Sequence, residues 1–345
     1  MIGKVEQACP ELKGSAILEG KKVLVTGAGG FIGSHLVEAL LEKGACVRAF
    51  VKYNSRSDWG MLSELPTESQ KSLDVVPGDI RDAFLVRKAV EGCDYVFHLA
   101  ALIGIPYSYV APSDYVAVNV MGTVNVLQAC RDERIKRLVH TSTSETYGTA
   151  LYVPIDEKHP MQGQSPYSAS KIGADKMAES YHNSFGLPVV IVRPFNTYGP
   201  RQSSRAFIPT VISQALSLKK IVMGSLEPVR DMSFVKDTAE GLIKVGLCDR
   251  VVGQTVNLGT GEGETIGTVV DTILHMLGKE SMSVEEDSTR IRPAKSEVMR
   301  LISDNTKARE TCGWTPQYDL TEGLLETIEW IRKNLHRYRP ARYTI

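Results

Sequence analysis

Residues 23–33 read Val-Leu-Val-Thr-Gly-Ala-Gly-Gly-Phe-Ile-Gly. The apolar run that opens this stretch predicts a buried strand, and residues 34–43 then carry leucine and valine at helical spacing. Between them, Gly27, Gly30 and Gly33 permit a tight bend, a close approach of the backbone to a pyrophosphate and close packing of helix on strand. A strand, a glycine turn and a helix in this order favour a dinucleotide-binding site over a purely structural turn.

The end of the second expected strand, Val47–Val51, bears on which dinucleotide is bound. NAD sites commonly carry an acidic residue there, which bonds the ribose 2′-hydroxyl. Here the strand runs into Lys52-Tyr53-Asn54-Ser55-Arg56, without an acid. Lys52 and Arg56 can pair with a 2′-phosphate, or they can be solvated loop cations. NADP is therefore favoured, and NAD stays possible.

Strand and helix patterns alternate as far as residue 192. Strands are expected at residues 73–76, 95–101, 137–141 and 189–192, and helices ahead of Gly92, at 114–131 and at 166–185. Such apolar strands are typical of a parallel sheet that is buried on both faces. Short connections between these units predict an α/β fold, a Rossmann-type doubly wound parallel sheet with ligands at the carboxyl ends of its strands.

Two polar residues lie at the ends of these strands. Asp79 is placed to accept a hydrogen bond from an adenine amino group, although either it or Asp82 can equally cap the next helix. His98 is expected to be a packed strand histidine rather than a catalyst.

Tyr167 and Lys171 stand four residues apart in a segment that reads as a helix, so both side chains project from one face. A tyrosine ordinarily has a pKa of about 10, which a nearby ammonium can lower. With an oxidised nicotinamide adding positive charge, the pair can act as a general base. The alternative is an ordinary exposed pair on a helix.

The overall composition points to a small-molecule partner. The 345 residues include 40 basic and 40 acidic side chains, which argues against nucleic acid or a membrane surface as partner. The six cysteines are widely spaced and no histidine cluster has metal-ligand spacing, so no metal site is expected. Neither a signal-peptide pattern nor a membrane-spanning run opens the chain, which predicts a cytoplasmic location. Residues 1–20 lack periodicity and read as an N-terminal extension.

Five motifs resemble the extended short-chain dehydrogenase/reductase family. They are Thr-Gly-x-Gly-Gly-Phe-Ile-Gly at 26–33, His-Leu-Ala-Ala at 98–101, Thr-Ser-Glu-x-Tyr-Gly at 143–148, Tyr-x-x-x-Lys at 167–171 and Arg-Pro-Phe-Asn-x-Tyr-Gly-Pro at 193–200. The resemblance covers nearly the whole chain after residue 20.

Within that family the chain resembles the nucleotide-sugar 4,6-dehydratases. The triplet Thr143-Ser144-Glu145 is similar to that of GDP-mannose 4,6-dehydratases, and residues 155–167 more closely resemble the GDP-N-acetylglucosamine 4,6-dehydratase of bacterial legionaminic acid synthesis. The resemblance implies conversion of a nucleotide hexose to its 4-keto-6-deoxy form.

The resemblance also implies roles at the reaction centre. Tyr167 would take the proton of the sugar 4-hydroxyl while the C4 hydride leaves, and Thr143 would orient that oxygen. Glu145 would then remove the acidified C5 proton, water would leave from C6, and the hydride would return to C6. Ser144 stands where many of these dehydratases have an aspartic acid, so Glu145 would also protonate the leaving hydroxyl, with Ser144 as an intermediary or a spacer. The alternative for Glu145 is a plain surface carboxylate.

Two sets of ligand-binding residues follow. The cofactor set comprises Gly27, Gly30, Phe31, Ile32, Gly33, Lys52, Arg56, Asp79, Ile80, Leu99, Ala100, Ala101, Tyr167, Lys171 and Pro194. The substrate set comprises Thr143, Asn196, Arg205, Arg230 and Arg292. Arginine suits a diphosphate because its fork donates two parallel hydrogen bonds, although Arg230 and Arg292 can each be surface residues.

The family pattern implies two interleaved lobes. The dinucleotide-binding domain is expected at 21–200 and 229–262, and a smaller nucleotide-sugar lobe at 201–228 and 263–345. A homodimer is expected through helices 114–131 and 166–185, although burial within one chain explains their apolar stripes equally well.

Three other functions stay open. A nucleotide-sugar decarboxylase uses a similar triplet, whereas a 4-epimerase shares the cofactor and the Tyr-Lys pair but does not need Glu145. A regulatory NADP-binding protein is disfavoured, because Thr143, Tyr167 and Lys171 are all present.

Overall fold

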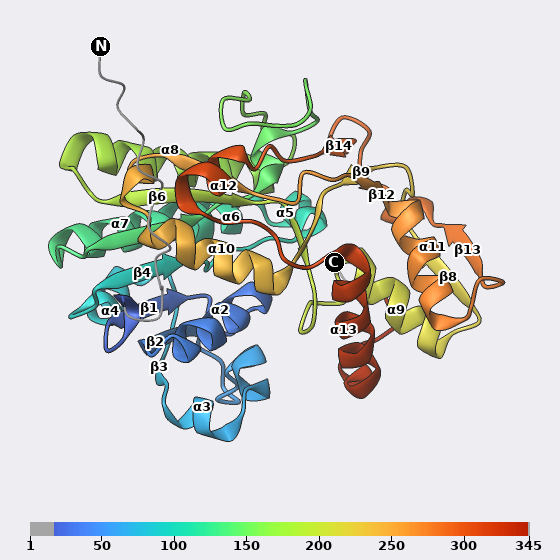
Figure 1. Ribbon diagram of the computed structural model, residues 1–345, viewed down its shortest axis with the longest axis horizontal. Helices are drawn as coiled ribbons and strands as arrows, with labels where there is room; N and C mark the ends of the chain where they lie inside the picture. The colour runs from blue at the N-terminus through green and yellow to red at the C-terminus, as the bar shows by residue number, and fades with distance from the viewer. Residues whose placement is uncertain (1–16, 344–345) are drawn as a thin grey trace, which may run out of the picture.

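The computed structural model describes residues 17–343. The expected N-terminal extension of residues 1–20 therefore lies almost entirely outside the described residues. Of its last residues, Leu18 is fully buried in the core of the larger lobe, so this end of the segment is part of the fold. Figure 1 shows a larger lobe built around a sheet and a smaller lobe beside it.

The larger lobe is built on a seven-stranded sheet in the order β11-β6-β5-β4-β1-β2-β3, in which every pairing is parallel. Its strands are β1 (Lys22–Thr26), β2 (Cys46–Lys52), β3 (Asp74–Gly78), β4 (Tyr95–His98), β5 (Arg137–Thr141), β6 (Val189–Pro194) and β11 (Thr255–Leu258). The chain builds the sheet outward from β1 in one direction and then from β4 in the other. This confirms the predicted doubly wound fold and places a ligand crevice outside the carboxyl ends of β1 and β4.

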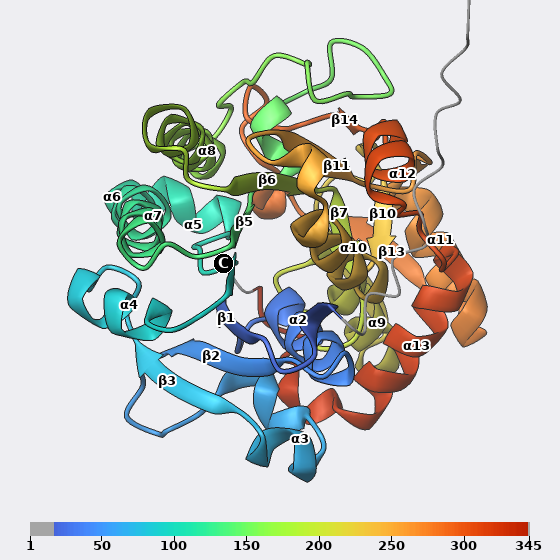
Figure 2. The same cartoon turned by 60° about the vertical axis from the view of Figure 1, so that its left-hand side comes forward.

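Helices cover both faces of this sheet (Figure 2). One face carries α2 (Phe31–Glu42), α10 (Val235–Leu247) and α12 (Thr306–Cys312), and the other carries α4 (Ala83–Val90), α7 (Gly122–Asp132) and α8 (Pro166–Phe185). Short helices occupy the connections: α3 (Thr67–Lys71), α5 (Ile105–Val110), α6 (Pro112–Tyr115), and 3-10 turns at Gly60–Glu64, Ser144–Tyr147, Asp249–Val251, Ser288–Arg290 and Leu335–Arg337. The sheet is thus buried on both sides, as its apolar strands require.

The helix expected at 114–131 is not regular. A π-helical segment, Val116–Met121, separates α6 from α7. Within it, the buried Asn119 donates to the Leu102 carbonyl (2.9 Å) and to the Ser170 hydroxyl (2.9 Å), and accepts from the Leu102 amide (2.8 Å). A wide π turn of this kind is commonly found beside functional sites. Here Asn119 ties it to the loop after β4 and to α8.

The smaller lobe has a core of its own (Figure 1). It contains α9 (Phe207–Ser217), α11 (Ile266–Leu277), α13 (Leu320–Lys333) and the parallel pair β8 (Lys220–Met223) and β13 (Ser283–Glu286). Short ladders join the lobes: β7 (Asn196–Tyr198) with β10 (Met232–Phe234), and β9 (Val229–Arg230) with β12 (Glu264–Thr265) and β14 (Arg300–Leu301). The exact domain boundaries stay a prediction.

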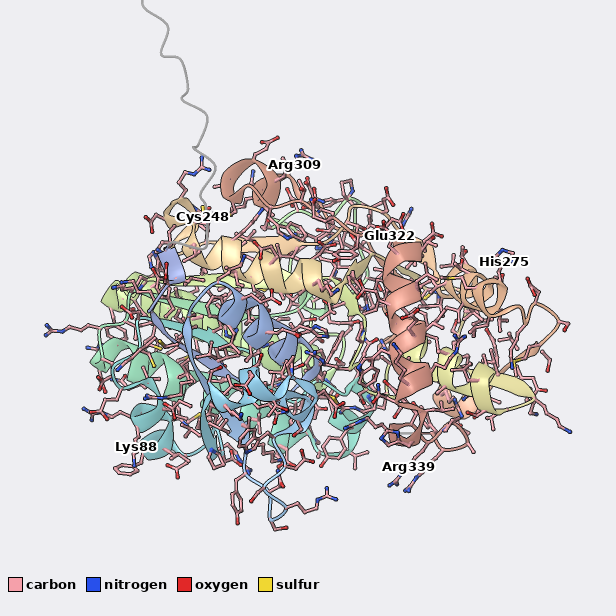
Figure 3. The ribbon with its side chains drawn as sticks, turned by 60° about the horizontal axis from the view of Figure 1, so that its bottom comes forward. Lys88, Cys248, His275, Arg309, Glu322 and Arg339 are labelled. Carbon is pink, nitrogen blue, oxygen red and sulfur yellow. The ribbon has the colours of Figure 1, made fainter. Side chains whose placement is uncertain are left out.

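The long axis of the molecule runs from one lobe to the other. In Figure 3, Lys88 of α4 and His275 of α11 lie at opposite ends. Among residues 17–343, no helix combines the length and the apolar character needed to cross a membrane.

Candidate active site

The turn between β1 and α2 leaves no room for a side chain at Gly27 or Gly33. Gly27 has a φ of +70°, and a Cβ on it would lie 2.8 Å from the Ala100 amide nitrogen. A Cβ on Gly33 would collide with the Gly27 carbonyl oxygen. The turn is also fixed to the end of β4, because the Thr26 hydroxyl accepts from the Leu99 and Ala100 amides, at 3.2 Å each. This backbone cradle at the start of α2 fits the pyrophosphate of a dinucleotide.

A single cavity of about 1140 Å³ opens from this cradle and continues into the smaller lobe. Its lining includes most of the residues expected from the sequence: Gly27, Gly30, Phe31, Ile32, Gly33, Lys52, Asp79, Ile80, Leu99, Ala100, Ala101, Glu145, Tyr167, Lys171, Pro194, Asn196, Arg205, Arg230 and Arg292. Arg56, Thr143 and Ser144 are not part of it. One continuous cavity thus connects the expected cofactor site with the expected substrate site.

The loop after β2 differs from the prediction. Arg56 is exposed and away from the cavity, whereas Asp58 lines it. The Asn54 Oδ1 accepts from the amides of Arg56 and Asp58, at 3.1 Å each, and the Asp58 Oδ1 accepts from the Gly60 amide at 2.7 Å. This turn carries the chain back toward the glycine cradle. The expectation that no acid follows β2 at the cavity is therefore wrong.

Asp79 is not a helix cap. Its carboxylate accepts from the Arg81 amide (2.9 Å) and from the Arg81 guanidinium (2.9 and 2.7 Å), whereas Asp82 caps α4 by accepting from Phe84 and Leu85. The hydrogen bonds from Arg81 lower the pKa of Asp79 to about 2, so it is ionised. Asp79 and Arg81 both line the cavity. His98 is a buried strand histidine, as expected, held between Thr26 (2.8 Å) and Thr123 (3.1 Å).

Tyr167 and Lys171 lie in the first turns of α8, which Ser165 begins with a capping box. They are 7 % and 4 % exposed, so they are not an ordinary surface pair. Burial raises the pKa of Tyr167, and a hydrogen bond with Thr143 opposes this rise. Lys171 donates from Nζ to the Thr141 carbonyl at 2.7 Å, and burial lowers its pKa to about 8. The expected lowering of the tyrosine pKa by Lys171 is thus not found, because the cost of burying a phenolate dominates.

Glu145 reaches the cavity from the 3-10 turn Ser144–Tyr147. The Thr143 hydroxyl caps this turn by accepting from the Glu145 amide at 3.2 Å. Glu145 is half-buried and its charge acts on both Tyr167 and Arg230. It is therefore not a plain surface carboxylate. Ser144 is 2 % exposed and does not line the cavity, which favours its interpretation as a spacer.

The arginines expected to face a diphosphate lie at the junction of the lobes. Arg230 is 5 % exposed, which excludes a surface role, and its guanidinium lies 3.4 Å from the Glu297 carboxylate. Arg292 lies 3.4 Å from the same oxygen. Glu297, which the sequence did not single out, thus holds both guanidinium groups at one wall of the cavity. Arg205 is exposed at the mouth, and the Asn196 Oδ1 is buried without a hydrogen-bond partner among the described residues.

The residues that form the far wall of the cavity were not predicted from the sequence either. This wall includes Gly224, Arg290, Arg342 and Tyr343. The Arg290 guanidinium lies 4.9 Å from the centre of the Tyr343 ring. No local pattern signals this wall, because the end of the chain returns to it only in three dimensions.

Comparison with known proteins places the chain in a family. The family model described as GDP-mannose 4,6 dehydratase matches residues 24–327. A dTDP-glucose 4,6-dehydratase of Actinoplanes sp. is 33% identical over 91% of this chain and 98% of the relative. A UDP-glucose 4-epimerase of Mycolicibacterium smegmatis is likewise 33% identical, over 90% of this chain and 98% of the relative.

Solved structures of one relative also resemble this chain. The dTDP-glucose 4,6-dehydratase of Streptomyces venezuelae, crystallised with NAD bound, has a TM-score of 0.83 to 0.84 in two structures, at 31% identity over 93% of this chain and 99 to 100% of the other. The expected relationship to nucleotide-sugar 4,6-dehydratases is confirmed at this level, without a choice of sugar or base. The chain belongs to the GDP-mannose 4,6 dehydratase family.

Proposed function

We propose that the protein is a nucleotide-sugar 4,6-dehydratase, a hydro-lyase that keeps a nicotinamide dinucleotide bound through its cycle. The observation that supports this most is Glu145, which lies in the same cavity as Tyr167 and Lys171 and acts electrostatically on Tyr167. An oxidation at C4 alone needs only the tyrosine and the lysine, whereas removal of a C5 proton needs a second base. The matching family model and the dehydratase relatives agree with this proposal.

In this proposal each residue of the site has a separate role. A bound nicotinamide would accept the C4 hydride and later return it to C6. Tyr167 takes the hydroxyl proton, and Thr143, which hydrogen-bonds with Tyr167 at the edge of the cavity, orients that oxygen. The positive charge of a bound nicotinamide would add to that of Lys171 and favour the phenolate, which burial alone disfavours. Glu145 removes the C5 proton and passes it to the leaving C6 oxygen. Arg230 and Arg292 bind the diphosphate, which displaces Glu297 as their partner.

For the substrate we propose GDP-N-acetylglucosamine, on the resemblance of residues 155–167 to the dehydratase of legionaminic acid synthesis. The purified protein should be incubated with GDP-, UDP- and CDP-N-acetylglucosamine, GDP-mannose and UDP-glucuronate while product masses are followed. Loss of water from the GDP-N-acetylglucosamine supports the proposal. Loss of carbon dioxide indicates a decarboxylase.

A 4-epimerase is the second candidate, because one relative of equal identity carries that name. It predicts an unchanged mass and a new sugar stereoisomer in the same experiment. No turnover of any of these sugars, with the cofactor still bound, would favour a regulatory dinucleotide-binding protein.

For the cofactor we propose that NADP binds at least as well as NAD, because Lys52 lines the cavity beside the end of β2. Asp58, which also lines the cavity, would act in the other direction, and a solved relative holds NAD. Lys52→Ala is expected to weaken NADP binding about tenfold and to leave NAD binding unchanged, as a lost charge-assisted contact would. Titration of both cofactors into stripped protein measures this.

The loop provides a matched control. Arg56→Ala removes an exposed cation that does not line the cavity, and it should change neither affinity. A preference for NAD that Lys52→Ala leaves unaltered would contradict the phosphate contact.

We also propose a homodimer. Val116 and Met121, on the π-helical segment beside α7, are 54% and 53% exposed. Exposed large apolar side chains on this segment favour a protein partner over solvent. Sedimentation velocity measures the mass in solution, and a monomer at micromolar concentration would contradict the proposal.

A further inference from the structure

A buried cluster of charged groups lies directly behind the reaction centre. At its middle is Asp175, one helical turn after Lys171 on α8 and 1 % exposed. Its carboxylate accepts from the His140 Nε2 (3.2 Å), from the Ser142 hydroxyl (2.8 Å) and from the Arg193 guanidinium (3.2 and 2.9 Å). Every donor belongs to β5, β6 or the residue after β5. Asp175 therefore joins α8 to two strands, β5 and β6, whose last residues line the cavity.

The attachment is made next to Lys171. Lys171 donates to the Thr141 carbonyl, and the following residue, Ser142, donates to Asp175. Lys171 and Asp175, both on α8, thus accept or donate hydrogen bonds at two consecutive residues, Thr141 and Ser142, at the end of β5. Arg193 extends the cluster further, because its guanidinium lies 4.8 Å from the ring centre of Tyr147, in the turn that carries Glu145. The Asp175 carboxylate is thus linked to the strand end that binds Lys171 and, through Arg193, to the turn that carries Glu145.

Asp175 supplies negative charge to a cluster that also holds the cations of Lys171 and Arg193. Burial tends to raise the pKa of Asp175, but the hydrogen bond from His140 and the charges of Arg193 and Lys171 outweigh this and hold the pKa at about 2. Burial lowers the pKa of His98 and of His140, so both are neutral. Asp175 is therefore the negative charge packed against Lys171, which burial alone would drive toward the neutral amine.

We propose that Asp175 is a positioning residue of the reaction centre, which keeps the Lys171 ammonium charged and holds the end of β5 against α8 so that Lys171 and Tyr167 act together. The inference rests on the proposed function only where it concerns turnover. The charge state of Lys171 can be measured without any substrate.

Asp175→Asn tests the proposal, because the amide keeps the shape and removes the charge. NMR of protein labelled at the lysine Cε and Nζ, with Lys171→Arg to assign the signal, follows the titration of Lys171. The charge of Asp175 raises the pKa of Lys171, and a neighbouring opposite charge typically shifts a pKa by roughly one unit or more. Lys171 in the variant should therefore lose its proton at least about one pH unit lower than in the wild type. An unchanged Lys171 titration would overturn the proposal.

Turnover gives the second measurement. The ammonium is present below the pKa of Lys171 and is lost as pH rises through it, so the alkaline limb of the rate of C4 hydride transfer should move to lower pH in Asp175→Asn. With the Lys171 pKa moved from about 8 to about one unit lower, the rate should fall about twofold near pH 7 and nearly tenfold near pH 9, and it should recover as the solution is made more acidic. Equal loss at every pH would indicate a structural role and would overturn the proposal. If the wild type turns over no nucleotide sugar, the proposed function fails and the NMR titration still decides this one.

Two further variants separate charge from folding. Asp237→Asn is the matched control, since Asp237 is a buried carboxylate of α10 that accepts from the Gln317 and Tyr318 amides, away from the cavity. It should leave the Lys171 titration in place. If Asp175→Asn does not fold, the double variant Asp175→Asn/Lys171→Met tests the reason. It should fold if the unpaired ammonium of Lys171 destabilises the single variant, and its failure to fold would overturn the proposal.

Discussion

Replacing Tyr167 with phenylalanine is expected to stop both hydride transfer and water elimination. General acid–base catalysis by a positioned side chain contributes roughly 10²- to 10⁴-fold, so turnover should fall by at least about that factor. The C5 proton becomes acidic only after C4 has been oxidised, so its exchange with deuterated water should also stop. Rapid-mixing absorbance of the reduced nicotinamide and mass spectrometry of the sugar measure the two steps.

Tyr115 provides a matched control for this variant. Its ring lies 6.2 Å from that of Tyr167, but its hydroxyl donates to the Gly104 carbonyl and does not line the cavity. Tyr115→Phe should therefore keep hydride transfer within a few-fold of wild type. Full activity in Tyr167→Phe would show that another group is the base.

Glu145→Gln is expected to separate the two halves of the reaction. The amide has the size of the carboxylate but cannot accept a proton, so elimination should fall about 10³-fold. Substrate should still bind and exchange hydride at C4, because Tyr167 and Lys171 are unchanged. Exchange of the C5 proton in deuterated water should be lost, and this is the measurement that isolates Glu145.

Two other variants interpret that result. Glu157→Gln alters a half-buried glutamate nearby, whose carboxylate accepts from the Asn257 amide outside the cavity, and it should retain elimination. Ser144→Ala should slow turnover only slightly, because Ser144 does not line the cavity. Complete elimination by Glu145→Gln, together with its loss in Ser144→Ala, would reverse the assignment of acid and base.

Local sequence predicted what depends on local geometry. Gly27 is favoured by its positive φ and Gly33 by a backbone contact within the same turn, and the spacing of Tyr167 and Lys171 is a property of one helix. The parallel sheet could be predicted because each apolar strand is followed by a turn or loop that is recognisable in the sequence. These features could be predicted before any tertiary contact was known.

What the sequence did not predict depends on contacts between distant segments. Asp58 lines the cavity because Asn54 turns its loop back, and Glu297 matters because two arginines from separate segments meet on it. The π-helical segment holds Asn119, whose partners are Leu102 and Ser170. The direction of the Tyr167 pKa shift depends on its burial, which spacing alone cannot give.

The walls of the cavity come from both ends of the described chain, from Gly27 to Tyr343. During synthesis, the helix with Tyr167 and Lys171 leaves the ribosome long before α13 and the residues that follow it. The edge strand β11 also emerges only after part of the smaller lobe. A growing chain can therefore assemble most of its sheet early, whereas the cavity is enclosed only after the residues up to Tyr343 have been made.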